Sequence, residues 1–445
     1  MPMKTVIIGG GAAGTGAAGG VKAANRENEV VVYTSFEDIA YSPCGIPFVH
    51  GKEIDSFQRL FLAAKEDYVK AGIDIHYNTT VTGINLEAKT IQVSGEGTVA
   101  WDRLVIATGF EYADPGVPGG DLDGLYYVKN IRAAEQWDKR LDDVKRAVVV
   151  EASPLGVEMI TALAHRGIET HVVDPNPWTL GDTADPDIVA PVEKDWTDMG
   201  VKLHFNTKLE AFLGTGSVTG VRTSGGDLPA ELVVVATHKR PNNALASAAG
   251  IKIGSTGGII VGNDMATNVA GVWAAGDCIE VVHGVSQVPL QGLTGSHAYA
   301  QGKVAGFNAG GGRKVYSPVY VPWGMLAANQ MIGGVSFGET LAASLGIPHI
   351  MGVANGISRA RYYPGVQPVR VKLLAEPKSH KLIGAQMVGG EGIKERADFL
   401  AVCVRRGITL EDLATMENVY SPAIGALNEP IALAAQNALE NVGRG

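Results

Sequence analysis

The sequence predicts an α/β fold built from two similar strand–turn–helix units, followed by a C-terminal α+β module. The apolar, β-branched run Thr5–Ile8 is typical of a buried parallel strand, and it leads into a glycine-rich turn and an alanine-rich helix to about Asn25. The same succession recurs from Ala147–Val150, which indicates an internal duplication. Beyond the three glycines at 310–312 the pattern changes, and no further turn of this kind follows.

The first turn carries the spacing G-x-G-x-x-G in the context that this motif needs. Gly9, Gly11 and Gly14 follow a strand and open a helix, with Ala12 and Ala13 between the last two glycines. Gly9 permits a tight turn, Gly11 lets the backbone approach a pyrophosphate, and Gly14 lets the helix pack on the strand. The N–H groups at the start of the helix would then face the phosphates. A glycine-rich turn without a ligand is the alternative, but the context favours a dinucleotide site.

The next strand, Val30–Tyr33, ends at Thr34, where an acidic residue is expected to hold the ribose of a bound adenosine. A threonine hydroxyl can still make one hydrogen bond, so the site is weakened rather than excluded. Glu37 or Asp38 could also take this part.

The ends of two later strands are predicted to lie beside the dinucleotide site at the first turn. The apolar strand from Leu104 ends in Thr108 and Gly109, and we expect it to return to the first sheet. Residues 110–120, with their Pro-Gly pairs, predict a linker. A second small-residue strand end leads to Gly276 and Asp277, whose carboxylate could meet a ligand hydroxyl or merely cap the next helix. A helix rich in small residues is expected over 291–308.

The second turn departs from the glycine pattern. Glu151 and Ser153 stand at the first two glycine positions, and only Gly156, at the helix-packing position, is retained. A carboxylate where a pyrophosphate should approach is unfavourable unless it turns away or forms a pair. The next strand ends in Asp174, which would accept a hydrogen bond from a ribose 2′-hydroxyl and repel a 2′-phosphate. That favours NADH over NADPH, although a solvated strand end is an equally good interpretation.

Cys44 is the candidate chemical centre. Pro43 and Gly45 flank it and predict a turn that opens a helix, and a thiol at a helix N-terminus has a lowered pKa. Cys278 and Cys403 lie in apolar patterns, so we expect them in the core. Because Cys44 has no neighbouring cysteine, a redox cycle would pass through a mixed disulfide with substrate or a sulfenic acid. The alternative is an unreactive cysteine in a turn.

The last third of the chain predicts an α+β module without a nucleotide motif. Tyr363, with Tyr362, and Tyr420 stand at element boundaries, where tyrosine more often packs half-buried than takes part in chemistry. The strands and helices predicted in this module span residues 369–374, 382–387, 393–405 and 430–441.

Composition restricts the function classes. A formal net charge of −9 gives no basic footprint for nucleic acid or an anionic membrane. No apolar run reaches the length of about 20 residues that spans a bilayer, and no secretory signal pattern is visible. Three cysteines in 445 residues are typical of a reducing compartment, so we expect a cytoplasmic protein.

Together these features resemble the pyridine nucleotide-disulfide oxidoreductase superfamily. They are most similar to its single-cysteine branch: coenzyme A-disulfide reductases, NADH oxidases and NAD(P)H-dependent sulfur or polysulfide reductases. The most specific piece is Ser42-Pro43-Cys44-Gly45-Ile46-Pro47-Phe48, which resembles the redox-cysteine motif of the coenzyme A-disulfide reductases. The first glycine turn, Ala107-Thr108-Gly109, Ala275-Gly276-Asp277 and the two tyrosine segments support it, and the resemblance covers nearly the whole chain.

The resemblance implies a discontinuous Rossmann-like FAD-binding domain (1–112 and 245–312), a Rossmann-like NAD(P)-binding domain (113–244) and a C-terminal dimerisation domain (313–445). Cys44 would lie by the flavin ring of a homodimer, and Tyr363 (or Tyr362) and Tyr420 would act near the partner subunit's active cysteine. The substrate would be a small disulfide or sulfur compound, with coenzyme A as a further ligand and no metal. The cofactor-binding residues that it implies are Gly9, Gly11, Ala12, Ala13, Gly14, Thr34, Ser42, Pro43, Thr108, Gly109, Gly156, Glu158, Asp174, Gly276 and Asp277.

The departures from the family pattern cluster where NAD(P)H should bind. Glu151 and Ser153 replace glycines, and His238 stands where the family usually has glycine. We therefore expect an intact FAD and cysteine centre with an altered electron-donor site. The leading hypothesis is reduction of coenzyme A disulfide, persulfide or polysulfide with electrons from NAD(P)H. The alternatives are an NADH oxidase that reduces oxygen, a relative with another electron donor, and a flavin redox sensor with little turnover.

Overall fold

The computed structural model describes residues 2–181, 183–292, 294–316 and 318–442. The chain forms two compact units, each assembled from three segments. The first unit comprises Met1–Pro43, Gln58–Ala113 and His238–Val319, and the second comprises Cys44–Phe57, Asp114–Thr237 and Tyr320–Gly445. The segment that begins with Cys44 therefore belongs to a different unit from the residues on either side of it.

A five-stranded parallel sheet forms the centre of the first unit, in the order β19-β7-β1-β2-β3. The strand that leads to Thr108 is β7, and it pairs with β1, so its predicted return to the first sheet is confirmed. These strands are Lys4–Ile8 (β1), Glu29–Tyr33 (β2), Ile73–His76 (β3), Arg103–Ile106 (β7) and Val272–Ala274 (β19).

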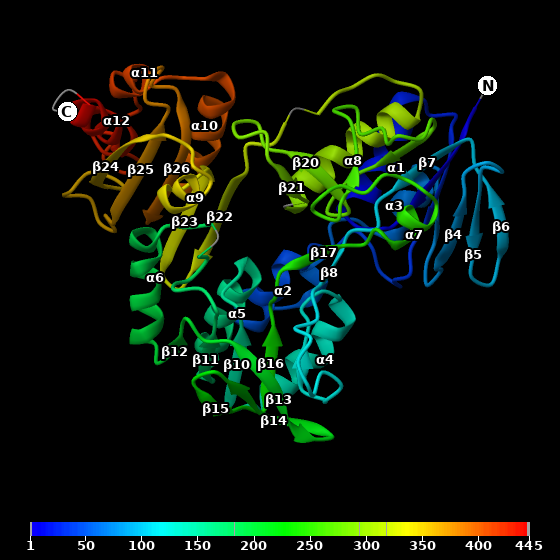
Figure 1. The fold of residues 1–445 in the computed structure, drawn as a ribbon, viewed down its shortest axis with the longest axis horizontal. Coiled ribbons are helices and arrows are strands. Elements are labelled where there is room, and N and C mark those ends of the chain that lie inside the picture. Colours follow the sequence, from blue (N-terminus) through cyan, green and yellow to red (C-terminus); the bar gives the residue numbers. More distant parts are fainter. Residues whose placement is uncertain (1, 182, 293, 317, 443–445) are drawn as a thin grey trace. The chain divides into compact units, whose positions relative to one another are not determined.

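Helices α1 and α8 pack closely against each other in this unit (Figure 1). Small residues allow the approach: a Cβ on Gly306 of α8 would lie 1.9 Å from the carbonyl oxygen of Ala17 in α1. The helices of the unit are Ala12–Ala24 (α1), Lys65–Lys70 (α3), Ala244–Ala248 (α7) and Gly295–Ala309 (α8). The predicted range 291–308 thus begins too early for α8, since Pro289–Gln291 forms strand β21, and residue 293 lies outside the described residues.

Three small sheets complete the first unit. The predicted linker over 110–120 is wrong at its start, because Phe110–Tyr112 (β8) pairs with Lys239–Pro241 (β17). The other two sheets contain Val81–Asn85 (β4), Thr90–Val93 (β5) and Gly97–Ala100 (β6), and Ile259–Ile260 (β18), Ile279–Val282 (β20) and Pro289–Gln291 (β21).

The second unit repeats the arrangement of the first, which confirms the predicted duplication. Its parallel sheet has the order β12-β11-β10-β16-β9, with β10 between its neighbours just as β1 lies between β2 and β7. The strands are Leu125–Tyr126 (β9), Arg146–Val150 (β10), Glu169–Val173 (β11), Lys202–His204 (β12) and Leu232–Val235 (β16). Around it lie helices Ile46–His50 (α2), Ile131–Leu141 (α4), Pro154–His165 (α5) and Pro186–Asp198 (α6), and strands Leu209–Thr215 (β13), Ser217–Thr223 (β14) and Gly226–Pro229 (β15).

The C-terminal part of the second unit is the predicted α+β module. Its five strands are antiparallel, in the order β22-β23-β26-β25-β24, and helices α10 and α12 pack on this sheet (Figure 1). The elements are Pro322–Ala327 (β22), Gln330–Ser336 (β23), Glu339–Ser344 (α9), Ile350–Ile357 (β24), Pro368–Ala375 (β25), Leu382–Gly389 (β26), Ile393–Arg406 (α10), Leu410–Ala414 (α11) and Pro430–Val442 (α12).

A buried ion cluster joins this module to the parallel-sheet part of the second unit. Lys372 of β25, with a side chain only 4% exposed, places its Nζ 3.0 Å from Asp185 and 2.6 Å from Asp187. Asp185 also accepts hydrogen bonds from the backbone N–H groups of Glu339 and Thr340 at the start of α9. A buried charge that lost these partners would be strongly destabilising, so the cluster holds the two parts together. Within the described residues, every helix is too short or too polar to cross a membrane.

Candidate functional site

The turn after β1 forms an open cradle at the start of α1. Gly9 has a φ of +112°, and a Cβ there would lie 2.1 Å from the carbonyl oxygen of Ala107. Gly14 lies so close to the strand that a Cβ would stand 1.9 Å from the Gly9 carbonyl oxygen. Gly11 is the N-cap and has open space at its Cβ position. Because Gly11 has no side chain, the first N–H groups of α1 stay available, and the cradle fits a pyrophosphate.

Thr34 contacts this cradle from the end of β2. Its side chain is buried, and a Cβ on Gly10 would lie 3.1 Å from its hydroxyl oxygen. That oxygen accepts a hydrogen bond of 3.3 Å from the N–H of Phe36. Of the two acidic alternatives, Asp38 is buried and Glu37 is exposed. A ribose contact by any of these residues stays a prediction.

Thr108 and Gly109 are tied to the segment by which the chain re-enters the first unit. The Thr108 hydroxyl donates to the carbonyl oxygen of Asn242 at 2.6 Å, and the Asn242 N–H donates to the Gly109 carbonyl oxygen at 2.9 Å. The Asn242 side chain returns a bond to the Thr108 carbonyl oxygen at 3.0 Å. These bonds hold the end of β7 to the chain at Asn242, and Ala107 of the same segment lies against Gly9 of the first turn.

Asp277 forms an ion pair that the sequence did not lead us to expect. Its Oδ2 lies 2.9 Å from Nζ of Lys239, and its side chain is only 11% exposed. Gly276 has a φ of +85°, and a Cβ there would lie 2.8 Å from Cβ of Ala13, so this pair of residues adjoins the first helix. Burial lowers the pKa of nearby His297, against the opposing charge of Asp277. Lys239 directly follows His238, a position where the chain departs from the family pattern, and that departure was a signal that could have drawn attention to it.

The second turn follows the same backbone path with different side chains. Glu151 has a φ of +68°, in the left-handed region that favours glycine. Ser153 is the N-cap of α5: its Oγ accepts from the Gly156 N–H at 3.3 Å and donates to the Ala236 carbonyl oxygen at 2.6 Å. A Cβ on Gly156 would lie 2.1 Å from the Glu151 carbonyl oxygen. Helix packing is thus preserved, while a side chain occupies the N-terminus of the helix.

Asp174 is turned toward this second turn. It is buried, and its Oδ2 accepts a hydrogen bond from the Ala152 N–H at 2.7 Å. Its Oδ1 accepts another from the Asn176 N–H at 2.8 Å. The carboxylate therefore holds the turn in place, and its contact with a ribose stays a prediction.

Glu158 lies on α5, two residues beyond Gly156. Burial raises its pKa to about 7. The carboxyl group therefore exchanges protons near neutral pH, which is a property found often at functional sites. Its contact with a nicotinamide is implied by the resemblance and stays a prediction.

Cys44 lies in a 3₁₀ turn, Pro43–Gly45, that leads directly into α2, as the sequence predicted. It is exposed, whereas Cys278 and Cys403 are buried, as expected of core residues. Burial raises the pKa of both buried thiols, that of Cys403 to about 11. Of the three thiols, Cys44 is the one that a solvent-borne reagent can reach.

The two tyrosine segments meet on the surface of the C-terminal module. The hydroxyl oxygens of Tyr362 and Tyr420 lie 3.1 Å apart, and the Ala360 N–H donates to the Pro422 carbonyl oxygen. Tyr362 is 75% exposed, so packing within the chain does not explain it. Tyr363 instead has its ring centroid 5.8 Å from the guanidinium of Arg359. The tyrosine that pairs with Tyr420 within one chain is therefore Tyr362.

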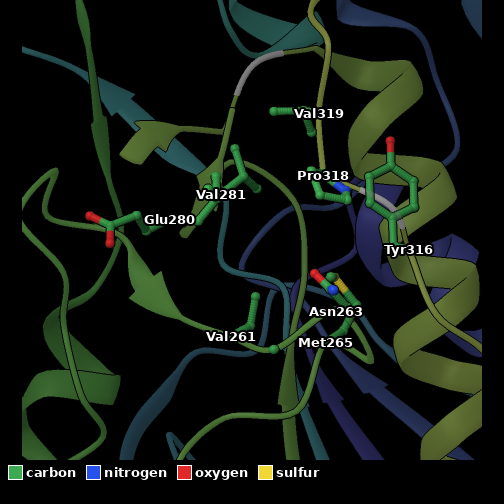
Figure 2. Close-up of a pocket in the computed structure, with 10 residues that line it drawn as sticks. Val261, Asn263, Met265, Glu280, Val281, Tyr316, Pro318 and Val319 are labelled. Atoms are coloured by element: carbon green, nitrogen blue, oxygen red, sulfur yellow. The ribbon is translucent and has the colours of Figure 1, made fainter. Parts of the chain in front are cut away.

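A pocket in the first unit lies apart from the predicted site residues. It measures about 50 Å³ and is lined mainly by apolar side chains of β20 and the segments around it, including Val261, Met265 and Val281 (Figure 2). None of the predicted site residues is among its lining residues. In the described parts of the chain, no three His, Cys, Asp or Glu side chains are grouped so as to hold a metal ion.

Comparison with known proteins agrees with this geometry. An "NADH oxidase" from Methanocaldococcus jannaschii is 35% identical over 99% of both chains. An "NAD(P)H coenzyme A polysulfide/persulfide reductase" from Pyrococcus horikoshii is 29% identical over 98% of both. Among solved structures, an NAD-dependent persulfide reductase from A. fulgidus has a TM-score of 0.96 and 29% identity, covering 99% of this chain and 84% of that one.

Two family models match as well. The model described as pyridine nucleotide-disulphide oxidoreductase matches residues 3–302, and the dimerisation domain of the same family matches residues 331–429. Together with the relatives, these matches confirm the predicted fold class and the predicted resemblance. The chain belongs to the pyridine nucleotide-disulphide oxidoreductase family.

Proposed function

We propose that this protein is an FAD-dependent oxidoreductase that reduces coenzyme A disulfide, persulfide or polysulfide with electrons from NAD(P)H. Cys44 is its single redox nucleophile. The observation that carries the proposal is that Cys44, in a turn before a short helix, is the one exposed thiol of three. The Pyrococcus horikoshii relative, whose name states this kind of activity, supports the substrate class.

FAD would be held by the first turn, through Gly9, Gly11 and Gly14, with Thr108 and Asp277 beside it. The open Cβ position of Gly11 and the uncapped start of α1 support this assignment. When bound, FAD supplies two-electron transfer between a nicotinamide and a disulfide. The nicotinamide nucleotide would be held by the second unit, at Gly156, Glu158 and Asp174. We propose residues 1–112 with 245–312 as the FAD-binding domain, 113–244 as the NAD(P)-binding domain and 313–445 as the dimerisation domain.

Cys44 would act on the substrate by thiolate attack. Its sulfur bonds to one sulfur of the substrate disulfide and the other sulfur leaves as a thiolate, so the enzyme carries a mixed disulfide. Two electrons and two protons then cleave that bond, which releases the second thiol and restores Cys44. The sum is one disulfide, one NAD(P)H and one proton converted to two thiols and one NAD(P)⁺.

The tyrosine pair and its surroundings fit a homodimer interface in this scheme. Exposed apolar side chains stand close to Tyr420 in the sequence, namely Val419, Ile424 and Leu427. Clusters of this kind mark interaction sites on soluble proteins, and the matched dimerisation domain covers this region. In a cytoplasmic homodimer, these tyrosines would act near the partner subunit's active cysteine.

Replacing Cys44 by serine tests the proposal. Reduction of coenzyme A disulfide and polysulfide should be lost, while flavin reduction by NADH under anaerobic conditions stays at the wild-type rate. Disulfide reduction that survives in Cys44→Ser would disprove the role of the thiol.

The alternative function is an NADH oxidase, and the Methanocaldococcus jannaschii relative favours it. In that case Cys44 would cycle through a sulfenic acid while oxygen is reduced. Rapid NADH-dependent oxygen uptake by the wild-type protein, together with negligible reduction of any disulfide or polysulfide, would select this alternative.

A further inference from the structure

A buried hydrogen-bond cluster is centred on His50, six residues after Cys44 and at the end of α2. The imidazole is fully buried. Its Nδ1 lies 3.1 Å from Oδ1 of Asp138, and its Nε2 lies 2.9 Å from the hydroxyl oxygen of Tyr126. All three residues belong to the second unit.

The chemistry of the three groups fixes their protonation. Burial is the main cause that lowers the pKa of His50, so the ring is neutral at pH 7. Burial alone would raise the pKa of Asp138, but the bond from His50 and the charges of Arg166 and Lys52 lower it overall. The ionised carboxylate can only accept, so Nδ1 carries the proton and Nε2 accepts from the Tyr126 hydroxyl.

Arg166 attaches the backbone of α2 to the same cluster. Its Nε donates to the carbonyl oxygen of His50 at 2.7 Å, and one Nη donates to Asp138 Oδ1, also at 2.7 Å. The next residue, Gly51, lies against α5, where a Cβ would be 3.3 Å from Cα of Ala162. The end of α2 is thus fixed through both its side chain and its main chain.

The rest of α2 connects this fixed end of the helix to Cys44. The helix is only one and a half turns long, and Ile46, Pro47 and Val49 are all buried. Cys44 itself is exposed, in the 3₁₀ turn that begins the helix. A short, buried helix has little freedom to pivot once its far end is fixed, so the direction of the thiol depends on the cluster at His50.

We propose that His50 is a positioning residue for Cys44: its bonds to Asp138 and Tyr126 hold α2 so that the thiol is presented to the substrate disulfide. This inference rests on the proposed role of Cys44 and adds to it the residue that sets the orientation of the nucleophile. A thiol held in line with the disulfide reacts faster than one that samples many directions, because orientation is already fixed before attack.

The test compares His50→Leu, which removes both side-chain bonds, with His50→Gln, whose amide can donate and accept. Tyr126→Phe removes only the donor to Nε2 and keeps the ring in place, so it serves as the milder variant if His50→Leu does not fold. The matched control is His171→Leu. His171 is also buried in the second unit and has two partners, His204 and Glu169, but it lies on β11.

Two readouts are measured on the flavin-loaded protein. One is kcat and KM for coenzyme A disulfide. The other is the rate at which iodoacetamide alkylates Cys44, which reports on this thiol because Cys278 and Cys403 are buried. For His50→Leu we expect kcat to fall by about tenfold. The KM and the rate of anaerobic flavin reduction by NADH should stay nearly unchanged. The rate of Cys44 alkylation should differ from that of the wild type. His50→Gln should recover part of the wild-type kcat and part of the wild-type alkylation rate. His171→Leu should lose stability while kcat and the alkylation rate stay unaltered.

The proposal is overturned if His50→Leu and Tyr126→Phe leave both readouts at wild-type values, or if His171→Leu changes them equally. The alkylation readout does not depend on the disulfide reaction. If Cys44→Ser retained disulfide reduction, the proposed function would fail, and alkylation of the His50 variants would still decide whether this cluster orients Cys44.

Discussion

The turn after β1 and the turn after β10 have similar backbones, but their side chains differ at the start of the helix that follows. Gly14 and Gly156 each let a helix approach its strand, with a would-be Cβ 1.9 Å and 2.1 Å from a carbonyl oxygen. In the first turn, Gly11 leaves the start of α1 uncapped. In the second, Ser153 caps α5 and Asp174 binds the Ala152 N–H.

The difference teaches that the fold requires the packing glycine, whereas the other two glycine positions accept larger residues. Glu151 shows that a larger residue can adopt the left-handed turn, at φ +68°. A second contrast lies two residues past each packing glycine. Gly16 lets α1 contact α8. The corresponding position on α5 is Glu158, and burial raises the pKa of this carboxyl group to about 7.

The largest expected effect tests the shared packing position. Gly14→Ala places a methyl group against the Gly9 carbonyl oxygen, so we expect a loss of about 3 kcal/mol or more in unfolding free energy and loss of bound FAD. Gly156→Ala should cost a similar amount but retain FAD. Flavin absorbance per chain and chemical denaturation measure both. Full FAD occupancy in Gly14→Ala would contradict the assignment of the first turn.

The second prediction concerns pH and the contrast between Gly16 and Glu158. The folded-state pKa of Glu158 is about 7 against an ordinary value of 4.5, so the native state holds a proton that the unfolded state has lost between these values. Stability should therefore fall as pH rises from 4.5 to 7 and stay constant above. Glu158→Gln should remove this fall and stabilise the protein at pH 8, by on the order of 2–3 kcal/mol.

Thermal or urea unfolding at pH 4, 6 and 8 measures this effect. The wild type and Glu158→Gln should differ little at pH 4. Parallel stability profiles of the two proteins from pH 4 to pH 8 would show that Glu158 is not the group responsible.

The third prediction converts the second turn toward the first. The double variant Glu151→Gly, Ser153→Gly removes a carboxylate from the turn and uncaps α5. If the turn limits binding, NADH affinity should rise by about tenfold, or 1.4 kcal/mol. Anaerobic titration with NADH and then NADPH, followed by flavin absorbance, measures it. Unchanged affinity would show that the altered turn is not the limiting feature.

The smallest effect concerns the Ser153 side chain. Ser153→Ala removes the acceptor for the Gly156 N–H and the donor to the Ala236 carbonyl oxygen, and should lower stability by about 1 kcal/mol. Gly11→Ser would be the reverse change in the first turn, and it should weaken FAD binding by occupying the N–H groups of α1. Retained FAD affinity in Gly11→Ser would weaken the assignment of those N–H groups to a phosphate.

Elements with strong local signals could be predicted from the sequence. The β-branched strand Thr5–Ile8, the helix after it and the duplicated strand at Ala147 all appear as expected, because short-range periodicity and glycine placement determine them. The helical start of α2 after Cys44 was likewise visible in its flanking residues.

Apart from the return of β7 to the first sheet, the long-range partners could not be predicted. The ion pair between Lys239 and Asp277 joins residues 38 positions apart, and the ion pair between Lys372 and Asp185 joins residues 187 positions apart. The pairing of β8 with β17, which joins Phe110 to Pro241, is also distant in sequence, and it replaced part of an expected linker. Such contacts depend on how the elements pack, for which a single sequence carries no periodic signal.

The discontinuous second unit has a consequence for recombination between relatives. A chimera that exchanged residues 114–237 would leave the Cys44–Phe57 segment behind, because that segment belongs to the same unit but is encoded far upstream. The recipient's cysteine helix would then meet foreign residues in place of Tyr126, Asp138 and Arg166. If residues 114–237 hold the electron donor and the His50 cluster positions Cys44, as we propose, such an exchange would separate the thiol from the residues that support it, and both pieces of chain would have to be exchanged to keep them together.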